Sequence, residues 1–152
     1  MVKLNYTGEY TRRLSNNQVR IPWRQLAQIL SQEDRLPSIF YGIVINKTNF
    51  PYICAYTPDH FHNEEKEIRE LVQESGVLKE IHEIPSDQVR RLKIPKELQA
   101  AAELGDYVNL MGVIDYLEIW NQEQAQQNMI ESPSREKSHS QLPEKYQKSI
   151  LY

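Results

Sequence analysis

The sequence contains little of several residue types, and each shortage excludes a class of protein. Its 152 residues include one cysteine, Cys54, so an internal disulfide is impossible and a thiolate metal site is not expected. Only five glycines are present, and no glycine-rich loop that cradles phosphate is found. No apolar run approaches the roughly 20 residues that span a bilayer, and the N-terminus lacks the apolar stretch of a secretory signal. These absences predict a reduced, cytoplasmic protein without a membrane partner.

The chain also lacks an excess of charge of one sign. Its 18 basic and 21 acidic side chains leave a net charge of −3, which excludes a globally basic protein. The charges are nevertheless unevenly distributed. Residues 1–30 carry five basic groups against one acidic group, and residues 87–99 carry four against two. Two basic stretches therefore lie in an otherwise acidic chain, and each can form a local basic patch.

Both basic stretches lead into the same local pattern. Residues 19–22 read Val-Arg-Ile-Pro and residues 92–95 read Leu-Lys-Ile-Pro. The alternation of apolar and basic residues predicts a short strand with one buried face, and the proline suits the first turn of a following helix. The residues expected on the buried faces of these helices are Trp23, Leu26, Ala27 and Leu30 in the first, and Leu98, Ala101 and Ala102 in the second, with Gly105 as C-terminal cap.

A pair of β-rich runs follows each expected helix. Residues 39–45 and 52–56 form the first pair, and residues 107–110 and 116–120 form the second. The chain thus contains two imperfect copies of one unit. Neither copy has enough apolar residues for a core of its own, so we expect the two to pack about a pseudo-two-fold axis in an α+β, mostly β fold.

The domain boundaries follow from these two copies. The first copy takes residues 1–60 and the second takes residues 77–123. Between them, residues 61–76 are expected to form a connecting segment with a helix over 63–75, because apolar residues share one helical face and Gly76 follows. From 124 to 152 the chain is rich in Gln, Ser and Pro, which predicts a disordered tail.

The second copy resembles the signature of the MraZ family. Residues 86–98 read S-D-Q-V-R-R-L-K-I-P-K-E-L, which is similar to that family's Asp-x-x-x-Arg followed by an apolar residue, any residue, an apolar residue and a proline. Residues 108–113 and 116–120 resemble its second hairpin, which ends in Glu-Ile-Trp. The resemblance covers about residues 78–123 well and residues 5–75 weakly, through the repeat.

The resemblance implies both a fold and a function. The fold would consist of two swapped-hairpin repeats of the AbrB and MraZ type, which form a small pseudo-symmetric barrel with short helices. The function would be that of a bacterial transcriptional regulator, not an enzyme. It would bind sequence-specifically to repeated sites in double-stranded DNA near cell-division and cell-wall genes. Proteins of this type act as ring-like homo-oligomers and would be nucleoid-associated.

Asp87 and Arg91 occupy the two defined positions of the family motif. A turn that carries both lets Asp87 hold the Arg91 guanidinium, which then loses less rotamer entropy on contacting a guanine edge or a phosphate. The alternative is a solvated ion pair that closes a β-turn. The other candidate DNA-binding residues would attract phosphates regardless of sequence; they are Arg90, Lys93 and Lys96 in the second copy, and Arg12, Arg13 and Arg20 in the first. For the first-copy arginines, the alternative is a charged strand edge that prevents aggregation.

The first copy departs from the motif. If the copies are aligned on their prolines, Leu14 and Gln18 take the Asp and Arg positions. If the first strand is two residues shorter, Asn16 and Arg20 take them instead. In the second copy, Arg90 occupies the position before the motif arginine, where the family usually has glycine. The chain is therefore expected to be a divergent member.

No other group of residues points to a reaction or a metal. His60, His62, Glu64 and His82 follow no established metal-ligand spacing and are expected at the surface, and no catalytic order of Ser, His and Asp is present. We therefore expect no catalytic residue, no metal and no cofactor. One alternative function stays open, that of an oligomeric interaction protein, antitoxin-like or a scaffold, whose tail binds a protein partner.

Overall fold

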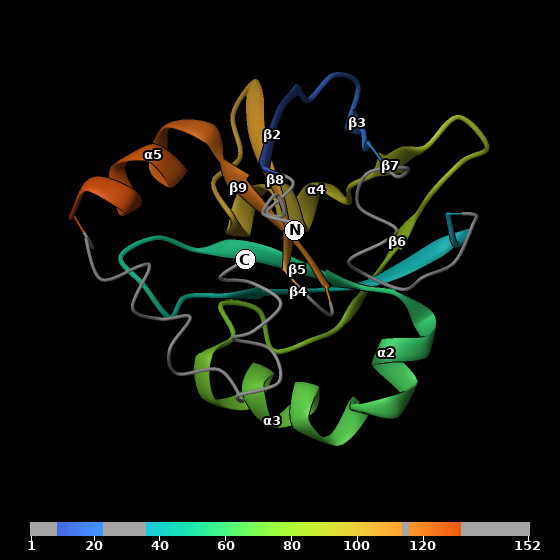
Figure 1. The fold of residues 1–152 in the computed structure, drawn as a ribbon. Coiled ribbons are helices and arrows are strands. Elements are labelled where there is room, and N and C mark those ends of the chain that lie inside the picture. The colour runs from blue at the N-terminus through green and yellow to red at the C-terminus, as the bar shows by residue number, and fades with distance from the viewer. Residues whose placement is uncertain (1–8, 23–35, 114–115, 132–152) are drawn as a thin grey trace, which may run out of the picture.

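A six-stranded antiparallel sheet forms the centre of the protein (Figure 1). The computed structural model describes residues 9–22, 36–113 and 116–131. The sheet has the strand order β2-β8-β9-β5-β4-β6, and a separate two-stranded sheet pairs β3 with β7. In chain order the strands are β2 (Glu9–Arg13), β3 (Gln18–Arg20), β4 (Ile39–Ile45), β5 (Tyr52–Tyr56), β6 (His82–Pro85), β7 (Arg91–Lys93), β8 (Tyr107–Val113) and β9 (Tyr116–Asn121). The fold is α+β and mostly β, as the sequence predicts.

Strand pairing crosses between the two halves of the chain. β2 from the first half pairs with β8 from the second, and β6 from the second half pairs with β4 from the first. β5 and β9 meet at the centre of the six-stranded sheet, and β3 pairs with β7 outside it. Every strand therefore depends, directly or through one neighbour, on the other half. This arrangement agrees with the small number of apolar residues in each half.

The edges of the six-stranded sheet are β2 and β6, and within the described residues the sheet is open there. Isolated bridges between Ser15 and Gln18 and between Ser86 and Leu92 connect the ends of these edge strands to β3 and β7. Pro85 lies opposite Ile39 in edge strand β6. Proline cannot donate a ladder hydrogen bond and is tolerated at such an edge. Closure into a barrel stays a prediction.

One hydrophobic core lies between the six-stranded sheet, the β3–β7 pair and α4 (Lys96–Ala101). The alternation in the two short strands is confirmed, because Val19 and Leu92 are buried while Arg20 and Lys93 are exposed. Burying an aliphatic side chain of this size contributes about 1.5–3 kcal/mol. The other buried members are Ile21, Phe40, Val44, Ile53, Ala55, Ile84, Ile94, Leu98, Ala102, Val108, Leu110, Leu117 and Ile119.

A second core covers the opposite face of the sheet, beneath α2 (Pro58–Asn63) and α3 (Glu65–Ser75) (Figure 1). Aromatic pairs form much of it. Tyr41 stacks on Phe61 with ring centroids 4.4 Å apart, and Tyr52 stacks on Trp120 at 4.3 Å. Such offset pairs add roughly 0.5–1.5 kcal/mol each beyond their buried area.

The connecting segment differs from its predicted form. The expected helix over 63–75 is present as α3, but α2 precedes it and begins before residue 61. Thr57 starts α2, because its hydroxyl accepts a hydrogen bond from the His60 amide at 3.4 Å and Pro58 suits the first turn. No helix in the described part of the chain is long and apolar enough to cross a bilayer.

The β-rich runs of both copies are confirmed as strands, and β8 continues three residues past the predicted end at 110. The helix expected after Pro95 is present as α4, whereas the helix expected after Pro22 falls on residues 23–35, which lie outside the described residues. Gly105 does not cap α4. Glu103 takes the left-handed conformation instead, with a φ of 57°.

The chain does not become disordered at residue 124. Helix α5 (Gln122–Glu131) follows β9 directly, so the expectation of a disordered tail is wrong for residues 124–131; residues 132–152 lie outside the described residues. Asn121 accepts a hydrogen bond from the Gln124 amide at 3.1 Å and starts the helix. Ala125 and Asn128 are buried on one face. The polar composition concealed this narrow buried face.

Substituting Gly76 tests how α3 is joined to the sheet. Gly76 ends α3 and bridges to Ile45 of β4. A Cβ added there would lie against the Val72 carbonyl oxygen and 2.6 Å from the Leu78 carbonyl oxygen, so the backbone would have to move. We expect Gly76→Ala to lower the free energy of unfolding by about 1–3 kcal/mol in denaturant titration. Gly105→Ala is the matched control, because its added Cβ would meet nothing closer than 3.8 Å; an equal loss in both variants would contradict the explanation.

Candidate nucleic-acid interface

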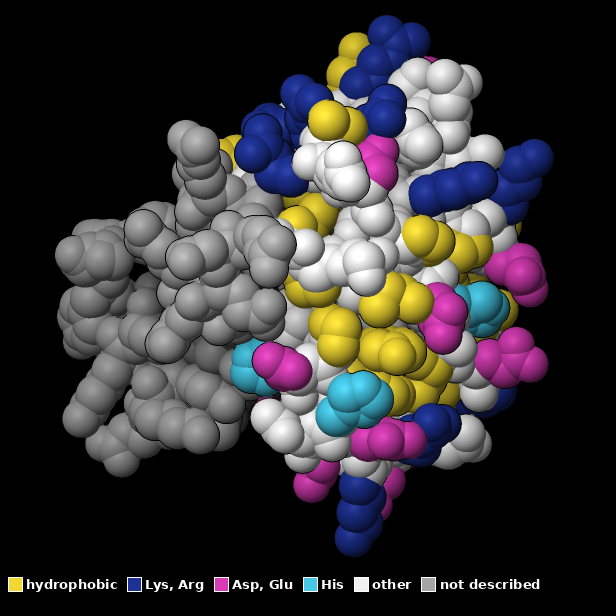
Figure 2. All heavy atoms as spheres, turned by 90° about the vertical axis from the view of Figure 1, so that its right-hand side faces the viewer, with side chains coloured by type: hydrophobic (Ala, Val, Ile, Leu, Met, Phe, Trp, Pro, Cys, Tyr) yellow, Lys and Arg dark blue, Asp and Glu magenta, His cyan; other side chains and the backbone are white. Residues whose placement is uncertain are grey.

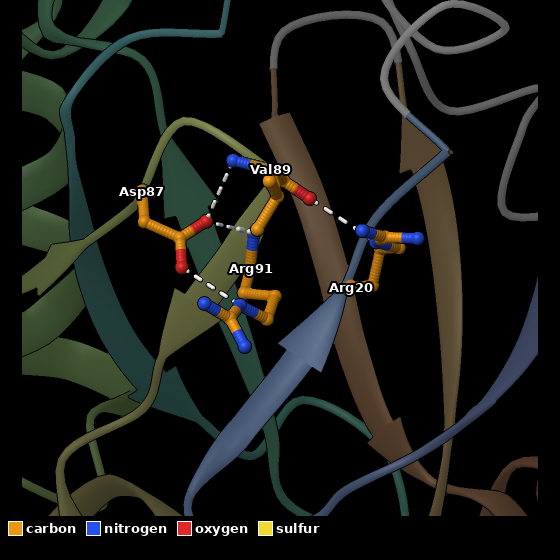
Figure 3. A network of polar contacts seen from close by, with 4 residues as sticks. All are labelled: Arg20, Asp87, Val89 and Arg91. Carbon is orange, nitrogen blue, oxygen red and sulfur yellow. Dashed lines mark hydrogen bonds and ion pairs between the residues drawn. The ribbon is translucent and has the colours of Figure 1, made fainter.

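The five residues 87–91, here called the basic turn, join β6 to β7. The Asp87 carbonyl accepts a hydrogen bond from the Arg90 amide, and the Asp87 amide donates to the Arg91 carbonyl, both at 3.1 Å. One carboxylate oxygen of Asp87 accepts the amides of Val89 at 3.0 Å and Arg91 at 2.9 Å. The other accepts the Arg91 Nε at 2.7 Å (Figure 3). Asp87 thus fixes both the backbone of the turn and the side chain of Arg91.

Arg90 has a φ of 67°, in the left-handed region that favours glycine. The three-residue loop between Asp87 and Arg91 needs this conformation at its last residue, so that the chain can re-enter a strand. This requirement gives a physical reason for the glycine that the resembling family usually has at this position. Arg90 tolerates the conformation and remains exposed.

The hydrogen bonds to Asp87 lower the pKa of its carboxyl group from its ordinary value of 3.8. The largest cause is the backbone amide of Arg91, with further contributions from the Arg91 side chain and the Val89 amide. Asp87 is therefore ionised at neutral pH. The Arg91 side chain is 49% exposed, and a surface ion pair of this kind contributes little to stability. Its main effect is to orient the guanidinium, whose terminal N–H donors are not used by Asp87.

Arg20 from the first half of the chain reaches the same turn. It lies directly opposite Arg91 in the β3–β7 pair. Its Nε donates to the Val89 carbonyl oxygen at 3.1 Å (Figure 3). The amide of the next residue, Ile21, donates to the Arg90 carbonyl at 2.9 Å. The structure therefore brings three arginines to one turn, of which only Arg91 is bonded to the Asp87 carboxylate.

The first copy's turn is built differently. Ser15 and Gln18 exchange two backbone hydrogen bonds of 2.9 Å around a loop of only two residues, Asn16 and Asn17, whose φ values are 54° and 64°. Asparagine tolerates this conformation, and the loop is one residue shorter than in the basic turn. The alignment on the prolines is therefore correct for Gln18, which takes the position of Arg91, but wrong for Leu14, because the shorter loop places Ser15 at the position of Asp87. Neither Leu14 with Gln18 nor Asn16 with Arg20 forms a counterpart of the Asp87–Arg91 pair.

The remaining candidates lie farther along the same elements. Lys93 is exposed at the opposite end of the β3–β7 pair, opposite Gln18, and Lys96 is exposed at the start of α4. Arg12 and Arg13 are in edge strand β2, where the Arg12 guanidinium lies over the Tyr10 ring at 5.4 Å. In Figure 2, Lys and Arg side chains gather at the top of the face, the level at which Figure 1 shows β7 and its preceding turn. Only Arg20, Arg90 and Arg91 meet at the turn itself.

The histidines and the cysteine noted in the sequence lie outside the basic turn. His60 and His62 are in α2 and His82 is in β6. Among the described residues, no three His, Cys, Asp or Glu side chains gather closely enough to hold a metal ion. Cys54 is fully buried, and burial followed by the nearby Glu118 charge raises the pKa of its thiol. This environment suits a core residue, not a nucleophile.

Two features of the structure were not predicted from the sequence, one at the basic turn and one in the core. The partnership of Arg20 with the basic turn joins residues 69 positions apart, and no local pattern signals it. Glu118 is buried and accepts hydrogen bonds from Trp120 Nε1 at 2.8 Å and from the Tyr116 hydroxyl at 3.3 Å. The sequence predicts it only as part of the hairpin and does not predict these bonds. The alternation Tyr-x-Glu-x-Trp could have placed the three side chains on one face of the strand.

No family model matches this chain, and no curated protein matches it. The resemblance to the MraZ family therefore depends on the residues of the motif and hairpin alone.

Replacing Arg90 tests the strain in the basic turn. A non-glycine residue in the left-handed region costs roughly 1–2 kcal/mol. We expect Arg90→Gly to raise the free energy of unfolding by up to about 1 kcal/mol in denaturant titration, since part of the gain is offset by the greater backbone entropy of unfolded glycine. Lys93→Gly is the control, because the same change in an extended strand should be destabilising. A loss of stability in Arg90→Gly would show that the turn does not need glycine-like geometry.

The lowered pKa of Asp87 predicts how the stability of the protein depends on pH. A carboxyl group whose pKa is lowered by folding stabilises the folded state above its unfolded pKa, and this contribution is lost as pH falls through the folded pKa. We expect Asp87→Asn to lower the thermal midpoint at pH 7, with the difference from the unmodified protein disappearing below the folded pKa of Asp87, in acid. Asp106→Asn controls for net charge without altering the turn. A difference that persists unchanged in strong acid would contradict the assignment.

Proposed function

We propose that this protein is a sequence-specific, double-stranded DNA-binding transcriptional regulator of the MraZ type. The observation that carries the proposal is the basic turn, in which Asp87 holds the Arg91 guanidinium at 2.7 Å on an exposed surface. A held guanidinium can make a bidentate contact to a guanine edge, which contributes about 1–3 kcal/mol of discrimination. The exposed neighbours Arg20 and Arg90 would supply phosphate contacts.

The strand pairing supports the proposed family. The sheet order reads the same from either edge once β2, β3, β4 and β5 are matched with β6, β7, β8 and β9. In each half, one strand forms the sheet edge beside a strand of the other half: β2 pairs with β8, and β6 pairs with β4. This is the pattern expected of two swapped-hairpin repeats. The bridges that connect β2 to β3 and β6 to β7 would close such repeats into a small pseudo-symmetric barrel.

Assembly into a homo-oligomer is part of the proposal. One basic turn on a chain of net charge −3 gives a weak attraction to DNA. A ring presents several basic turns on one face, and simultaneous contact with repeated sites raises avidity by roughly 10²–10⁴. The proposed partners are therefore double-stranded DNA and further copies of this chain. Following the family resemblance, the sites lie near cell-division and cell-wall genes, and the protein acts in the cytoplasm in association with the nucleoid.

A groove on the protein surface favours a second candidate function, an oligomeric interaction protein. The groove has a volume of about 410 Å³ and lies between α3, β4 and the residues before β6. Tyr41, Phe61, Val72 and Ile81 line it with apolar surface, and exposed hydrophobic side chains are visible on this face in Figure 2. A protein partner of antitoxin or scaffold type would bind there or on the C-terminal segment. Substitution in the groove, or deletion of the C-terminal segment, would then abolish partner binding and leave DNA affinity unchanged, according to which of the two holds the partner.

The proposed function is tested by DNA titration at several salt concentrations, using the duplex upstream of the protein's own gene and a shuffled duplex. We expect log-affinity to fall linearly with log salt concentration, and Arg91→Ala to reduce the preference for the upstream duplex by about 1–3 kcal/mol. Light scattering of the same sample should give a mass of several subunits.

Arg69→Ala is a closely matched control. Arg69 forms an ion pair with Glu65 at 2.7 Å, four residues apart and exposed, as Arg91 does with Asp87. It lies in α3, away from the basic turn. Removing it deletes the same charge and the same kind of pair, and should leave DNA affinity unchanged. A DNA affinity that does not change with salt concentration, or that is the same in Arg91→Ala as in the unmodified protein, would contradict the regulator function.

A further inference from the structure

We infer that Arg20, although it belongs to the first half of the chain, is a phosphate-binding residue of the second half's basic turn, and that each chain contacts DNA at this end of the β3–β7 pair alone. The inference rests on the proposed DNA-binding function. It names which residues of the two pseudo-equivalent turns bind DNA and which do not.

The antiparallel pairing of β3 and β7 decides which residues meet. Each turn leads into its own strand and lies beside the far end of the other strand. Arg20, the last residue of β3, therefore lies opposite Arg91, and Lys93, the last residue of β7, lies opposite Gln18. The same exchange appears in the backbone, because Ile21 donates to the Arg90 carbonyl and Ile94 donates to the Asn17 carbonyl. Each end of the pair is thus a composite of both halves.

The two ends have very different charge. At the basic turn, Arg20, Arg90 and Arg91 are accompanied by the single carboxylate of Asp87. Like charges directly opposite each other in an antiparallel pair oppose folding, and the Arg20–Arg91 pair has this arrangement. Asp87 and the Val89 carbonyl each hold one of these arginines, but a single carboxylate faces the arginines of the turn, so anions bound beside them would stabilise both. The chemistry matches the phosphates of a nucleic-acid backbone.

Both opposed guanidiniums are held by the turn itself. Asp87 accepts from the Nε of Arg91, and the Val89 carbonyl accepts from the Nε of Arg20. In Figure 3 the Arg91 guanidinium lies below Val89 and the Arg20 guanidinium lies to its right, so the two are apart from each other. Because each contact uses Nε, it leaves the terminal N–H donors of the guanidinium for a ligand. Two guanidiniums fixed on either side of one turn suit separate phosphates along a backbone better than a single small anion.

The other end of the pair carries no comparable group. Its turn consists of four uncharged residues, Ser15 to Gln18, and the Asn17 side chain is already bonded to Gln99 of α4 at 3.0 Å. Only Lys93 is charged in the paired strands there, and an ammonium is a point charge without the planar fork of arginine. The first copy's turn therefore has a structural role only. Arg20, which belongs to the first copy, is part of the second copy's binding site.

The experiment compares Arg20→Ala with Lys93→Ala, its pseudo-equivalent at the other end of the same pair. DNA affinity of the full chain is measured across salt concentrations with the upstream duplex. We expect Arg20→Ala to reduce the slope of log-affinity against log salt by about one for each subunit in contact, which is about fivefold in affinity per contact at 0.15 M salt. Lys93→Ala should change neither the slope nor the affinity. Circular dichroism and light scattering check that both variants keep their fold and mass.

Arg20→Lys separates a phosphate contact from support of the turn. The lysine keeps the positive charge, so it should retain most of the slope of log-affinity against log salt. It has no Nε group to donate to the Val89 carbonyl, so this support of the turn would be lost. A slope that is lost equally in Arg20→Ala and Arg20→Lys would overturn the inference, as would equal losses in Arg20→Ala and Lys93→Ala. If Arg91→Ala weakens binding while Arg20→Ala does not, this inference fails and the proposed function stands. If the unmodified protein does not bind DNA at low salt, the proposed function itself fails.

Discussion

The antiparallel pairing of β3 with β7 is the constraint on which the rest of the structure depends. It joins the two basic stretches of the chain, although they are about 70 residues apart in sequence. Its buried side chains, Val19 and Leu92, belong to the core beneath the six-stranded sheet. Its exposed side chains present arginine and lysine to solvent. The same pairing therefore supplies both the hydrophobic contact that holds the halves together and the placement of charge that a nucleic-acid site requires.

Hydrogen bonding at the basic turn shows how a weak interaction can still matter. The Asp87–Arg91 ion pair is exposed and contributes little to stability. The same carboxylate, however, also accepts two backbone amides, so the turn and the side chain are held in one geometry. The entropy of ordering Arg91 is thus largely lost on folding, before any ligand binds. Arg69 has a similar ion pair with Glu65, but the carboxylate that holds Arg91 also fixes the backbone of a turn.

Pseudo-symmetry in the fold coexists with asymmetry in the chemistry. The two halves exchange strands in the same way, yet one turn is three residues long and charged while the other is two residues long and neutral. The shorter loop places Ser15, which has no carboxylate, at the position that Asp87 takes in the basic turn. Arg20 nevertheless lies close to a carboxylate-braced turn, because the crossing of strands brings it to the other half. A duplicated fold can therefore concentrate its charged residues at one end.

Local patterns in the sequence determined most of the secondary structure and the Asp87–Arg91 contact, because alternation, proline and a four-residue spacing act over short distances. They did not reveal α5, in which the buried side chains among those described are Ala125 and Asn128, one small and one polar. Nor did they reveal the length of the first turn, which depends on one residue. Which strands pair, and hence that Arg20 lies opposite Arg91, was decided by the tertiary structure. Neither half can bury its apolar face alone, and this shared core brings distant residues together.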